Sequence, residues 1–223
     1  MRPRPAFYRT ARFLAHVVGR ALWGVRVAGR EHVPATGALL VAVSHESVLD
    51  PVVVGAEFPR TLRFLARNTL FGPRGEVRWY GRAIGALGAV PIERDGGGAR
   101  DTLRLALELL RQGDAVLIFP EGTRSPDGRL QEFRKGVALI ARAAGCPVLP
   151  VGLRGTRDLW RKGAKLPRLF GGPVQVHIGA PVTYGDDTRP DDVLADLRER
   201  IVALRGADEA PPGADGERKN EDG

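Results

Sequence analysis

The sequence contains one cysteine, few aromatic residues and no long hydrophobic run. Because Cys146 is alone, an internal disulfide and a cysteine-rich zinc site are both excluded, which favours a cytosolic location. The longest apolar runs, such as ALLVAV at residues 38–43, are far shorter than the ~20 residues that cross a bilayer. The first residues, MRPRPAFYRTARF, lack the apolar stretch of a signal peptide, so we expect them to stay on the mature protein.

Acidic residues are absent from residues 1–30, which hold seven arginines. Residues 206–223 have the reverse balance, with six acidic and two basic side chains. Without this tail the net charge would be +12 instead of +8, which predicts anionic partners such as anionic lipid or phosphorylated molecules. Aromatic residues make up 6% of the chain, too few to supply stacking platforms among the basic clusters, so we predict no nucleic-acid partner.

The length of 223 residues and a hydrophobic content of 43% predict one folded domain, which we place at residues 25–205. Residues 206–223 have no apolar pattern and are predicted to be disordered. Residues 1–24 form a separate unit, because apolar side chains recur at helical spacing between Phe7 and Val25 with arginines among them. Such a helix either docks on the core or lies in the headgroup region of an anionic membrane, and the missing acids favour the membrane.

Short apolar segments alternate with helical patterns, which predicts an α/β fold with a mixed, largely parallel central sheet flanked by helices. The predicted strands are Val25–Ala28, Ala38–Val43, Leu62–Ala66, Ala89–Ile92, Ala115–Phe119, Pro147–Leu153 and Val174–Ile178. The predicted helices after the N-terminal one are Ala99–Arg111, Lys135–Ala144 and Pro190–Leu204. Gly113 and Gly145 follow two of these helices and are expected to end them.

The stretch SHESVLDP, residues 44–51, places His45 five positions before Asp50, directly after a predicted buried strand. Ligand-binding groups of α/β proteins gather in the loops beyond the carboxyl ends of strands. If Asp50 accepts the Nδ1 proton of His45, Nε2 is left free to take a proton from an alcohol. Asp50 also precedes a proline and VVVGAEF, so we predict that it caps a helix as well.

A second polar loop, in AVLIFPEGTRSPDGRL at residues 115–130, follows another predicted strand. The hydroxyl of Thr123, the guanidinium of Arg124 and backbone amides near Gly122 suit a phosphate group. A solvated loop with a surface pair between Arg124 and Glu121 is the alternative. A third stretch, GAVPIERDGGG at residues 88–98, places Arg94 just beyond a strand.

Other motifs are missing. No G-x-S-x-G is present, which excludes a serine hydrolase elbow, and the glycines at 96–98 fit no dinucleotide-binding or P-loop pattern. His16, His32 and His177 lack a comparable setting, and we interpret them as structural or solvent-facing. One histidine base, one carboxylate, loop arginines and a basic helix fit acyl transfer to or from a phosphorylated, lipid-like alcohol.

Four blocks resemble, in order, the motifs of the lysophospholipid acyltransferases of the 1-acyl-sn-glycerol-3-phosphate acyltransferase type. They are SHESVLD (44–50), GAVPIER (88–94), FPEGTRS (119–125) and VLPVGLRG (148–155). The resemblance spans roughly residues 25–182 and includes FRKG at 133–136 and VHIGAPV at 176–182. Two positions depart from the family pattern: Ser44 stands where members often have asparagine, and Glu93 where many have aspartate.

The resemblance implies a role for each matching residue. His45 would be the general base that deprotonates the acceptor hydroxyl, and Asp50 would orient it. The acceptor phosphate would be bound by residues of the second and third blocks and of FRKG, namely Arg94, Glu121, Gly122, Thr123, Arg124 and Lys135. Pro150 and Val151 in the fourth block would help to form the acyl-donor pocket.

The implied reaction moves an acyl group from a thioester, carried by coenzyme A or acyl carrier protein, to a lysophosphatidic-acid-type acceptor. It needs no cofactor and no metal. The implied location is peripheral, on the cytoplasmic face of an anionic membrane. There are three alternatives: glycerol 3-phosphate or another lysophospholipid as the acceptor, a noncatalytic module that binds anionic lipid, and an esterase that uses the same base against water. The esterase is disfavoured because nothing indicates an activated serine or a metal-bound water. The pair of His45 and Asp50 argues against the noncatalytic module.

Overall fold

The structure is a computed structural model that describes residues 5–67, 70–71, 78–92, 98–160 and 166–206. Its strands are β1 (Arg26–Ala28), β2 (Leu39–Val43), β3 (Leu62–Arg67), β4 (Ala89–Ile92), β5 (Ala115–Ile118), β6 (Val148–Arg154) and β7 (Gln175–Ile178). Its helices are α1 (Pro5–Trp23), α2 (Asp50–Glu57), α3 (Arg78–Ala86), α4 (Gly98–Arg111), α5 (Lys135–Ala144), α6 (Thr156–Leu159) and α7 (Pro190–Arg205), with a 3₁₀ turn η1 (Arg30–His32).

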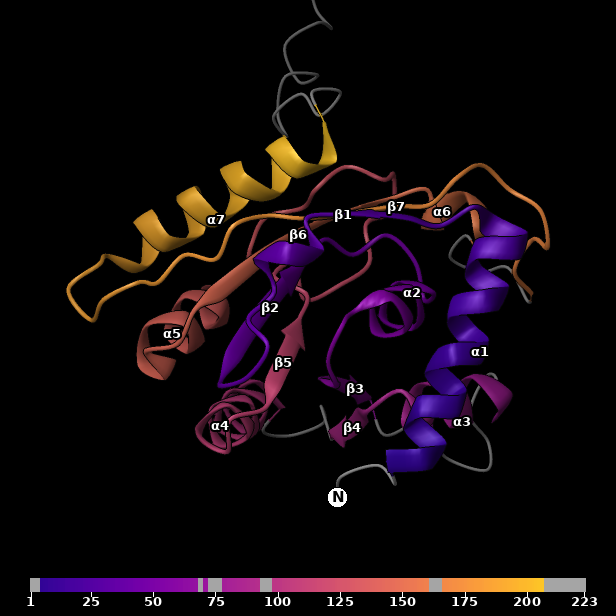
Figure 1. Ribbon diagram of the computed structural model, residues 1–223. Coiled ribbons are helices and arrows are strands. Elements are labelled where there is room, and N and C mark those ends of the chain that lie inside the picture. Colours follow the sequence, from indigo (N-terminus) through magenta and orange to yellow (C-terminus); the bar gives the residue numbers. More distant parts are fainter. Residues whose placement is uncertain (1–4, 68–69, 72–77, 93–97, 161–165, 207–223) are drawn as a thin grey trace, which may run out of the picture.

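The seven strands form one sheet in the order β1-β7-β6-β2-β5-β3-β4. Every neighbouring pair is parallel except β6 and β7, so β1 and β7 run opposite to the other five strands. Helices α1, α2 and α3 lie on one side of the sheet, and α4, α5 and α7 lie on the other (Figure 1). The predicted fold class, an α/β domain with a mixed, largely parallel sheet, is confirmed.

The central strand β2 shows why the apolar run at residues 39–43 forms a strand covered on both sides. All five of its residues are buried. Leu39, Val41 and Val43 belong to the core beneath α2, whereas Leu40 and Ala42 belong to the core beneath α4, α5 and α7. Successive side chains of a strand point to opposite faces, so a strand with helices on both faces is apolar throughout.

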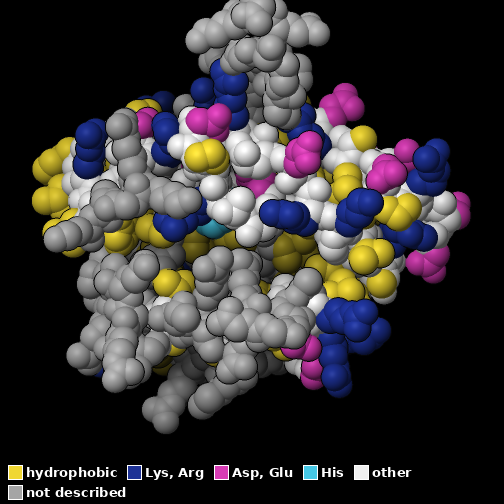
Figure 2. Space-filling view, turned by 180° about the vertical axis from the view of Figure 1, so that it is seen from behind, with side chains coloured by type: hydrophobic (Ala, Val, Ile, Leu, Met, Phe, Trp, Pro, Cys, Tyr) yellow, Lys and Arg dark blue, Asp and Glu magenta, His cyan; other side chains and the backbone are white. Residues whose placement is uncertain are grey.

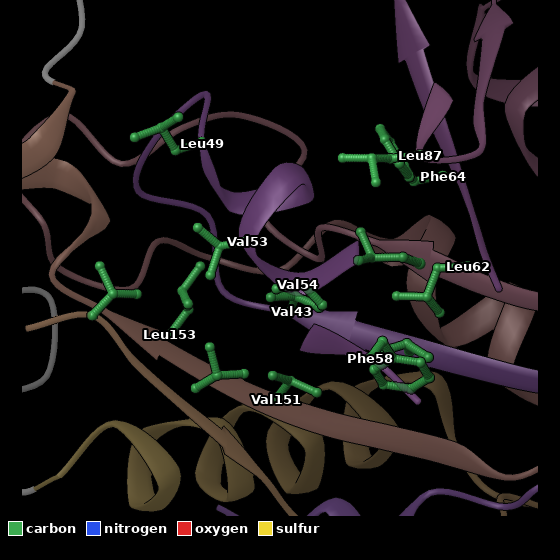
Figure 3. Close-up of a cluster of buried hydrophobic side chains, with 14 of the residues drawn as sticks. Val43, Leu49, Val53, Val54, Phe58, Leu62, Phe64, Leu87, Val151 and Leu153 are labelled. Atoms are coloured by element: carbon green, nitrogen blue, oxygen red, sulfur yellow. The ribbon is translucent and has the colours of Figure 1, made fainter. Parts of the chain in front are cut away.

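The core beneath α2 supports the segment that follows β2. Val53 and Val54 of α2 lie over Val43 of β2 and Val151 of β6 (Figure 3). Burying one such aliphatic side chain contributes about 1.5–3 kcal/mol, so this packing fixes the start of α2 relative to the strand ends.

Helix α1 packs one face on the core, as one interpretation of the N-terminal sequence expects, and leaves the other face exposed. Tyr8 and Trp23 are buried on the inner face, and Arg12 donates from Nε to the carbonyl of Ala56 at 3.3 Å. His16 of α1 contacts the buried carboxylate of Glu57 at 2.7 Å. The outer face exposes large hydrophobic side chains. Within the part of the chain that the structure describes, every helix is too short or too polar to span a bilayer.

All seven predicted strands are present, with each bound within one residue of the prediction, and so are the four predicted helices. Gly145 ends α5 with φ of 55°, as expected for a residue in the left-handed region. The prediction that Asp50 caps α2 is wrong. The cap position is Leu49, and Asp50 is the first helical residue, with its carboxylate turned back to the preceding loop. Helices α3 and α6 were not predicted, and the predicted tail beyond Gly206 lies outside the described residues.

Candidate active site

The loop after β2 and the loop after β5 lie next to each other and lead to helices on opposite faces of the sheet. These strands are parallel neighbours. The chain continues from β2 into α2 on one face, and from β5 into α5 on the other. Loops that leave in opposite directions open a crevice at the carboxyl edge of the sheet, where α/β proteins bind their ligands. His45 and Glu121 lie in these two loops.

His45 is held by contacts on its edge and on its face. Its Nδ1 lies 2.8 Å from Oδ2 of Asp50, and its ring stacks on Phe119 with centroids 3.8 Å apart and an angle of 15° between the planes. A carboxylate can only accept, so Nδ1 is the donor of this bond and Nε2 carries the lone pair. The side chain is 16% exposed, which leaves the imidazole accessible at one edge.

Asp50 is completely buried, and both oxygens of its carboxylate accept hydrogen bonds. Oδ2 accepts the backbone N–H groups of Glu46 at 2.7 Å and Ser47 at 2.8 Å, besides His45. Oδ1 accepts the hydroxyl of Thr156, the first residue of α6, at 2.5 Å. Four donors therefore fix the carboxylate, and through it the tautomer and direction of His45.

Glu121 joins the two loops. Its Oε1 accepts the backbone N–H of His45 at 2.7 Å, and its Oε2 accepts that of Gln131 at 2.9 Å. Ser125 completes the link, because its N–H donates to the carbonyl of His45 at 2.8 Å. Burial raises the pKa of Glu121 to about 7, although the donating amides of Gln131 and His45 lower it. The carboxyl is 1% exposed, so it positions backbone and does not open toward a ligand.

A buried ion pair ties the loop after β2 to the last helix. Arg205, at the end of α7, lies with Nη2 2.7 Å from Oε1 of Glu46, and both side chains are buried. The same nitrogen donates to the carbonyl of Gly128 at 2.6 Å, and the carbonyl of Arg205 accepts Nη1 of Arg154 at 2.7 Å. Arg205 thus contacts both loops of the site.

Ser44, one of the two residues that depart from the family pattern, bonds across the sheet. Its hydroxyl accepts the backbone N–H of Leu153 at 3.0 Å and donates to the Leu153 carbonyl at 3.4 Å. Its own N–H donates to the carbonyl of Val151 at 3.2 Å. The hydroxyl therefore extends the pairing of β2 with β6 by one residue beyond the strand and fixes the backbone just before His45.

The other predicted phosphate-binding residues are spread around the second loop. Thr123 and Lys135 are exposed, and Arg124 is half-buried. Gly122 has φ of 66°, which favours glycine, and a side chain added there would meet Cγ of Arg134 at 3.2 Å. Arg94 lies outside the described residues. The phosphate-binding role of all these residues stays a prediction, and the burial of Glu121 favours an indirect part for that residue.

Pro150 and Val151 lie within β6 and are both buried. Val151 belongs to the core beneath α2, and its carbonyl accepts the N–H of Ser44. Their part in an acyl-donor pocket stays a prediction. A cavity of about 260 Å³ lies between β4 and α4, and none of the predicted site residues that the structure describes lines it.

The face drawn in Figure 2 shows a histidine at the centre, flanked by Lys and Arg side chains and next to a recess with hydrophobic walls. A site for an acidic headgroup and an apolar chain has this combination of surfaces. Among the described residues, no group of three or more histidine, cysteine, aspartate or glutamate side chains lies close enough together to hold a metal ion.

Three site residues were not found in the sequence: Phe119, Thr156 and Arg205. Phe119 is the last residue of a predicted strand, and a phenylalanine there is interpreted as part of the hydrophobic core. Thr156 is 106 residues from Asp50, and Arg205 is 77 residues from Gly128, so no local pattern links them. Their one signal was position, because Phe119 is the first residue of the block at 119–125 and Thr156 directly follows the block at 148–155.

The geometry and the sequence point to the same class of protein. The chain belongs to the Acyltransferase family, whose sequence model matches residues 24–154. The matched segment runs from the residue before Val25 to the end of β6, and it contains His45, Asp50 and the loop after β5.

Individual relatives share one activity in their names. A chloroplastic 1-acyl-sn-glycerol-3-phosphate acyltransferase of Brassica napus is 35% identical over 179 residues, which are 79% of this chain and 49% of the relative. A 1-acyl-sn-glycerol-3-phosphate acyltransferase of Pseudomonas aeruginosa is 31% identical over 87% of this chain and 72% of the relative. The chain spans about half the length of the plant relatives that it matches.

A solved structure shares the fold. The crystal structure of the 1-acyl-sn-glycerophosphate acyltransferase PlsC from Thermotoga maritima matches with a TM-score of 0.69 and 30% sequence identity. The match covers 87% of this chain and 76% of the other.

Proposed function

We propose that this protein transfers a fatty acyl group from an acyl thioester to the free hydroxyl of 1-acyl-sn-glycerol 3-phosphate, which yields phosphatidic acid. The observation that carries the proposal is the hydrogen bond between Nδ1 of His45 and buried Asp50, at the crevice between β2 and β5. The relatives that share the fold and the motifs bear the name of this activity.

His45 is the general base of the proposed reaction. Nε2 takes the proton of the acceptor hydroxyl while the oxygen attacks the thioester carbonyl, and a tetrahedral oxyanion forms. When the oxyanion collapses, the carbon–sulfur bond breaks, and the imidazolium returns its proton to the leaving thiolate. A positioned base of this kind contributes roughly 10²- to 10⁴-fold. Asp50 stabilises the imidazolium and holds its ring in one orientation.

The acceptor phosphate binds at the loop after β5 in this proposal. Thr123 and Arg124 supply donors, and Lys135 adds positive charge at the first turn of α5, where the helix end also favours an anion. Arg94 is proposed to complete the set. Glu121 acts through the backbone, because its two bonds keep this loop in register with His45.

The donor is an acyl thioester of coenzyme A or acyl carrier protein, and we propose that Pro150 and Val151 shape the floor beneath its acyl chain. The chemistry needs no further cofactor, since the base, the nucleophile and the leaving group are all in place once both substrates bind. Effective alignment of hydroxyl and carbonyl supplies the rest of the acceleration.

The protein is proposed to work as a peripheral protein at the cytoplasmic face of an anionic membrane. The supporting feature is the outer face of α1, where Phe7, Phe13 and Leu14 are 62%, 65% and 57% exposed. The exposed side chain of Arg20 flanks this face. A lipid acceptor with a long acyl chain is presented by a bilayer, so such a surface brings the site to its substrate.

The test is an acceptor panel with acyl-CoA, in which products are identified by mass spectrometry. Lysophosphatidic acid, glycerol 3-phosphate, lysophosphatidylcholine and lysophosphatidylglycerol are offered at equal concentration in detergent micelles. We expect phosphatidic acid to be the main product. A main product from another acceptor overturns the substrate assignment, and the absence of any acylated product from wild-type protein overturns the proposed activity.

A further inference from the structure

The exposed large hydrophobic side chains of the described residues gather in two segments. Nine such side chains are exposed, and eight of them belong either to α1 or to residues 166–170. They are Phe7, Phe13, Leu14, Val17 and Val18 of α1, and Leu166, Leu169 and Phe170 of the second segment. The ninth, Leu139, lies on α5 on the opposite side of the sheet. Residues 166–170 are called the apolar loop below.

The side chains of the apolar loop are among the most exposed of this set: Leu166 is 69%, Leu169 64% and Phe170 77% exposed. Leaving three large hydrophobic side chains in water forgoes the stabilisation that their burial would bring. Contiguous exposed apolar surface of this kind marks a contact with a partner or a membrane.

The apolar loop is fixed beside the C-terminal end of α1. Nε1 of Trp23, the last residue of α1, donates to the carbonyl of Arg168 at 3.1 Å. The N–H of Arg168 donates to the carbonyl of Leu159 at 2.7 Å. Gly171 packs so closely on Leu159 that a side chain there would collide with it. The loop therefore has a defined position next to α1, and both lie at one end of the molecule (Figure 1).

The charge of these two segments suits an anionic surface. Residues 1–30 and 159–185 are the two longest stretches of the sequence without an acidic residue, and the second holds four lysine or arginine residues. In Figure 2 the α1 side of the molecule is the left edge. Hydrophobic side chains gather there, with Lys and Arg side chains beside them. Apolar side chains with basic residues nearby suit the interface of an anionic bilayer. There the apolar side chains enter the acyl region and the basic side chains contact lipid phosphates.

We propose that the apolar loop is a second membrane contact, in which Leu166, Leu169 and Phe170 insert into an anionic bilayer beside the outer face of α1. The inference rests on the proposed function in one respect, namely that the protein works on a membrane-borne lipid. One helix on a surface leaves the protein free to roll about the helix axis. A second contact beside its end removes that freedom and sets the angle at which the crevice meets the bilayer.

The apolar loop is also connected to the catalytic segment. The hydroxyl of Ser47, three residues before Asp50, donates to the carbonyl of Trp160 at 2.9 Å. Thr156, which donates to Asp50, begins the short helix α6 whose last residue, Leu159, accepts the N–H of Arg168. A short path of hydrogen bonds thus joins the proposed contact to Asp50 and His45, so docking of the loop acts on the direction in which Nε2 faces the acceptor.

The decisive experiment is sedimentation of full-length protein with vesicles of phosphatidylglycerol and phosphatidylcholine in equal amounts. The double variant L169S/F170S is compared with wild type and with Leu139→Ser, which removes an exposed leucine on the far side of the molecule. We expect the double variant to lose binding about 10-fold or more, because two inserted side chains are lost. Leu139→Ser should bind as wild type, and all three proteins should have the same thermal midpoint. Equal binding by L169S/F170S and wild type overturns the inference.

Two enzyme assays separate this inference from the proposed function. In detergent micelles the double variant should acylate lysophosphatidic acid at the wild-type rate, whereas on the vesicles it should be slowed as binding falls. A double variant that is equally fast on vesicles at limiting lipid counts against the second contact, with the activity itself intact. Failure of wild-type protein in micelles bears on the proposed function alone, since the vesicle sedimentation still reports on the loop.

Discussion

The two loops of the candidate site are held in different ways. In the loop after β2, Ser44 and Asp50 are fully buried and bond to backbone or to other buried side chains. In the loop after β5, buried Glu121 holds the backbone, while Thr123 is exposed and Arg124 half-buried. Proton transfer requires a fixed distance and direction, which suits the buried setting proposed for the base. The proposed binding of a headgroup tolerates adjustment, which suits the more exposed side chains of the second loop.

The largest effect is expected from removing the candidate base, His45. His45→Ala should lower kcat by roughly 10²- to 10⁴-fold while the thermal midpoint stays close to wild type, because the ring lies at the edge of the core and the buried bonds of Asp50 to amides remain. Rates with acyl-CoA and unfolding curves are measured on the same preparations. His32→Ala is the matched control, because Nδ1 of His32 bonds the carbonyl of Ile178 and this contact lies outside the site. Undiminished turnover by His45→Ala refutes the mechanism.

Asp50→Asn should affect both activity and stability. The amide nitrogen of asparagine cannot accept, so either the three donors that share Oδ2 or the Thr156 hydroxyl on Oδ1 loses its acceptor. We expect a loss of about 10²-fold in kcat and a destabilisation of about 1–3 kcal/mol. Steady-state kinetics and urea unfolding measure the two effects separately. A variant that is slow and fully stable would show that the carboxylate acts on His45 alone.

Breaking the buried ion pair tests whether α7 holds the rigid loop. Arg205→Met leaves Glu46 buried beside an apolar side chain and removes a donor from the carbonyl of Gly128, which should cost about 3–5 kcal/mol of unfolding free energy. The double variant E46L/R205M should recover a large part of this loss, because apolar replacement of a whole buried pair is often tolerated. A double-mutant cycle in urea gives the coupling. Additive losses would mean that the pair is not coupled.

The raised pKa of Glu121 predicts a pH-dependent contribution to stability. Its folded-state pKa of about 7 lies above the ordinary value of 4.5, so the folded protein holds a proton that the unfolded chain releases between these values. Unfolding free energy should therefore fall as pH rises from 4.5 to 7, by up to roughly 3 kcal/mol from this group. Glu121→Gln, which cannot ionise, should lack this slope. Urea unfolding at several pH values compares the two, and parallel curves would contradict the prediction.

The smallest effect is expected in the open loop. Lys135→Ala should raise KM for lysophosphatidic acid about 2- to 5-fold with kcat unchanged, because an exposed cation interacts weakly with a phosphate in water. The effect should shrink further as salt is added. Arg111→Ala, at the exposed end of α4, is the control for a change in net charge. A large fall in kcat with Lys135→Ala would show that this loop is as tightly coupled to the chemistry as the loop after β2.

Much of this site follows from local sequence, and the reason is visible in particular residues. The run ALLVAV predicted β2 because a strand with helices on both faces needs apolar side chains on both. His45 and Asp50 are five residues apart at the end of that strand, so their contact is local and could be expected. Gly145 marked the end of α5 because the left-handed turn there favours glycine.

Sequence reasoning was least reliable for the direction in which buried polar side chains point and for their hydrogen-bond partners. Asp50 has the sequence setting of a helix cap, yet its carboxylate turns back to the loop, where the amides of Glu46 and Ser47 compete for the same oxygen. For Glu121 a surface pair with Arg124 was one alternative, and the structure instead buries the carboxylate between two backbone segments. In both cases the choice depends on which donors the folded chain brings near, and residue type alone cannot rank them.

The sequence by itself determined the strands and longer helices, the block that carries the candidate base, and the basic, acid-free character of two segments. Periodicity and composition report what each element buries, and that information is local. Only the tertiary structure decided that Thr156 reaches Asp50, that Arg205 reaches Glu46, and that Trp23 fixes the apolar loop beside α1. These contacts join residues far apart along the chain, and they depend on the strand order and on the faces to which the crossover helices go.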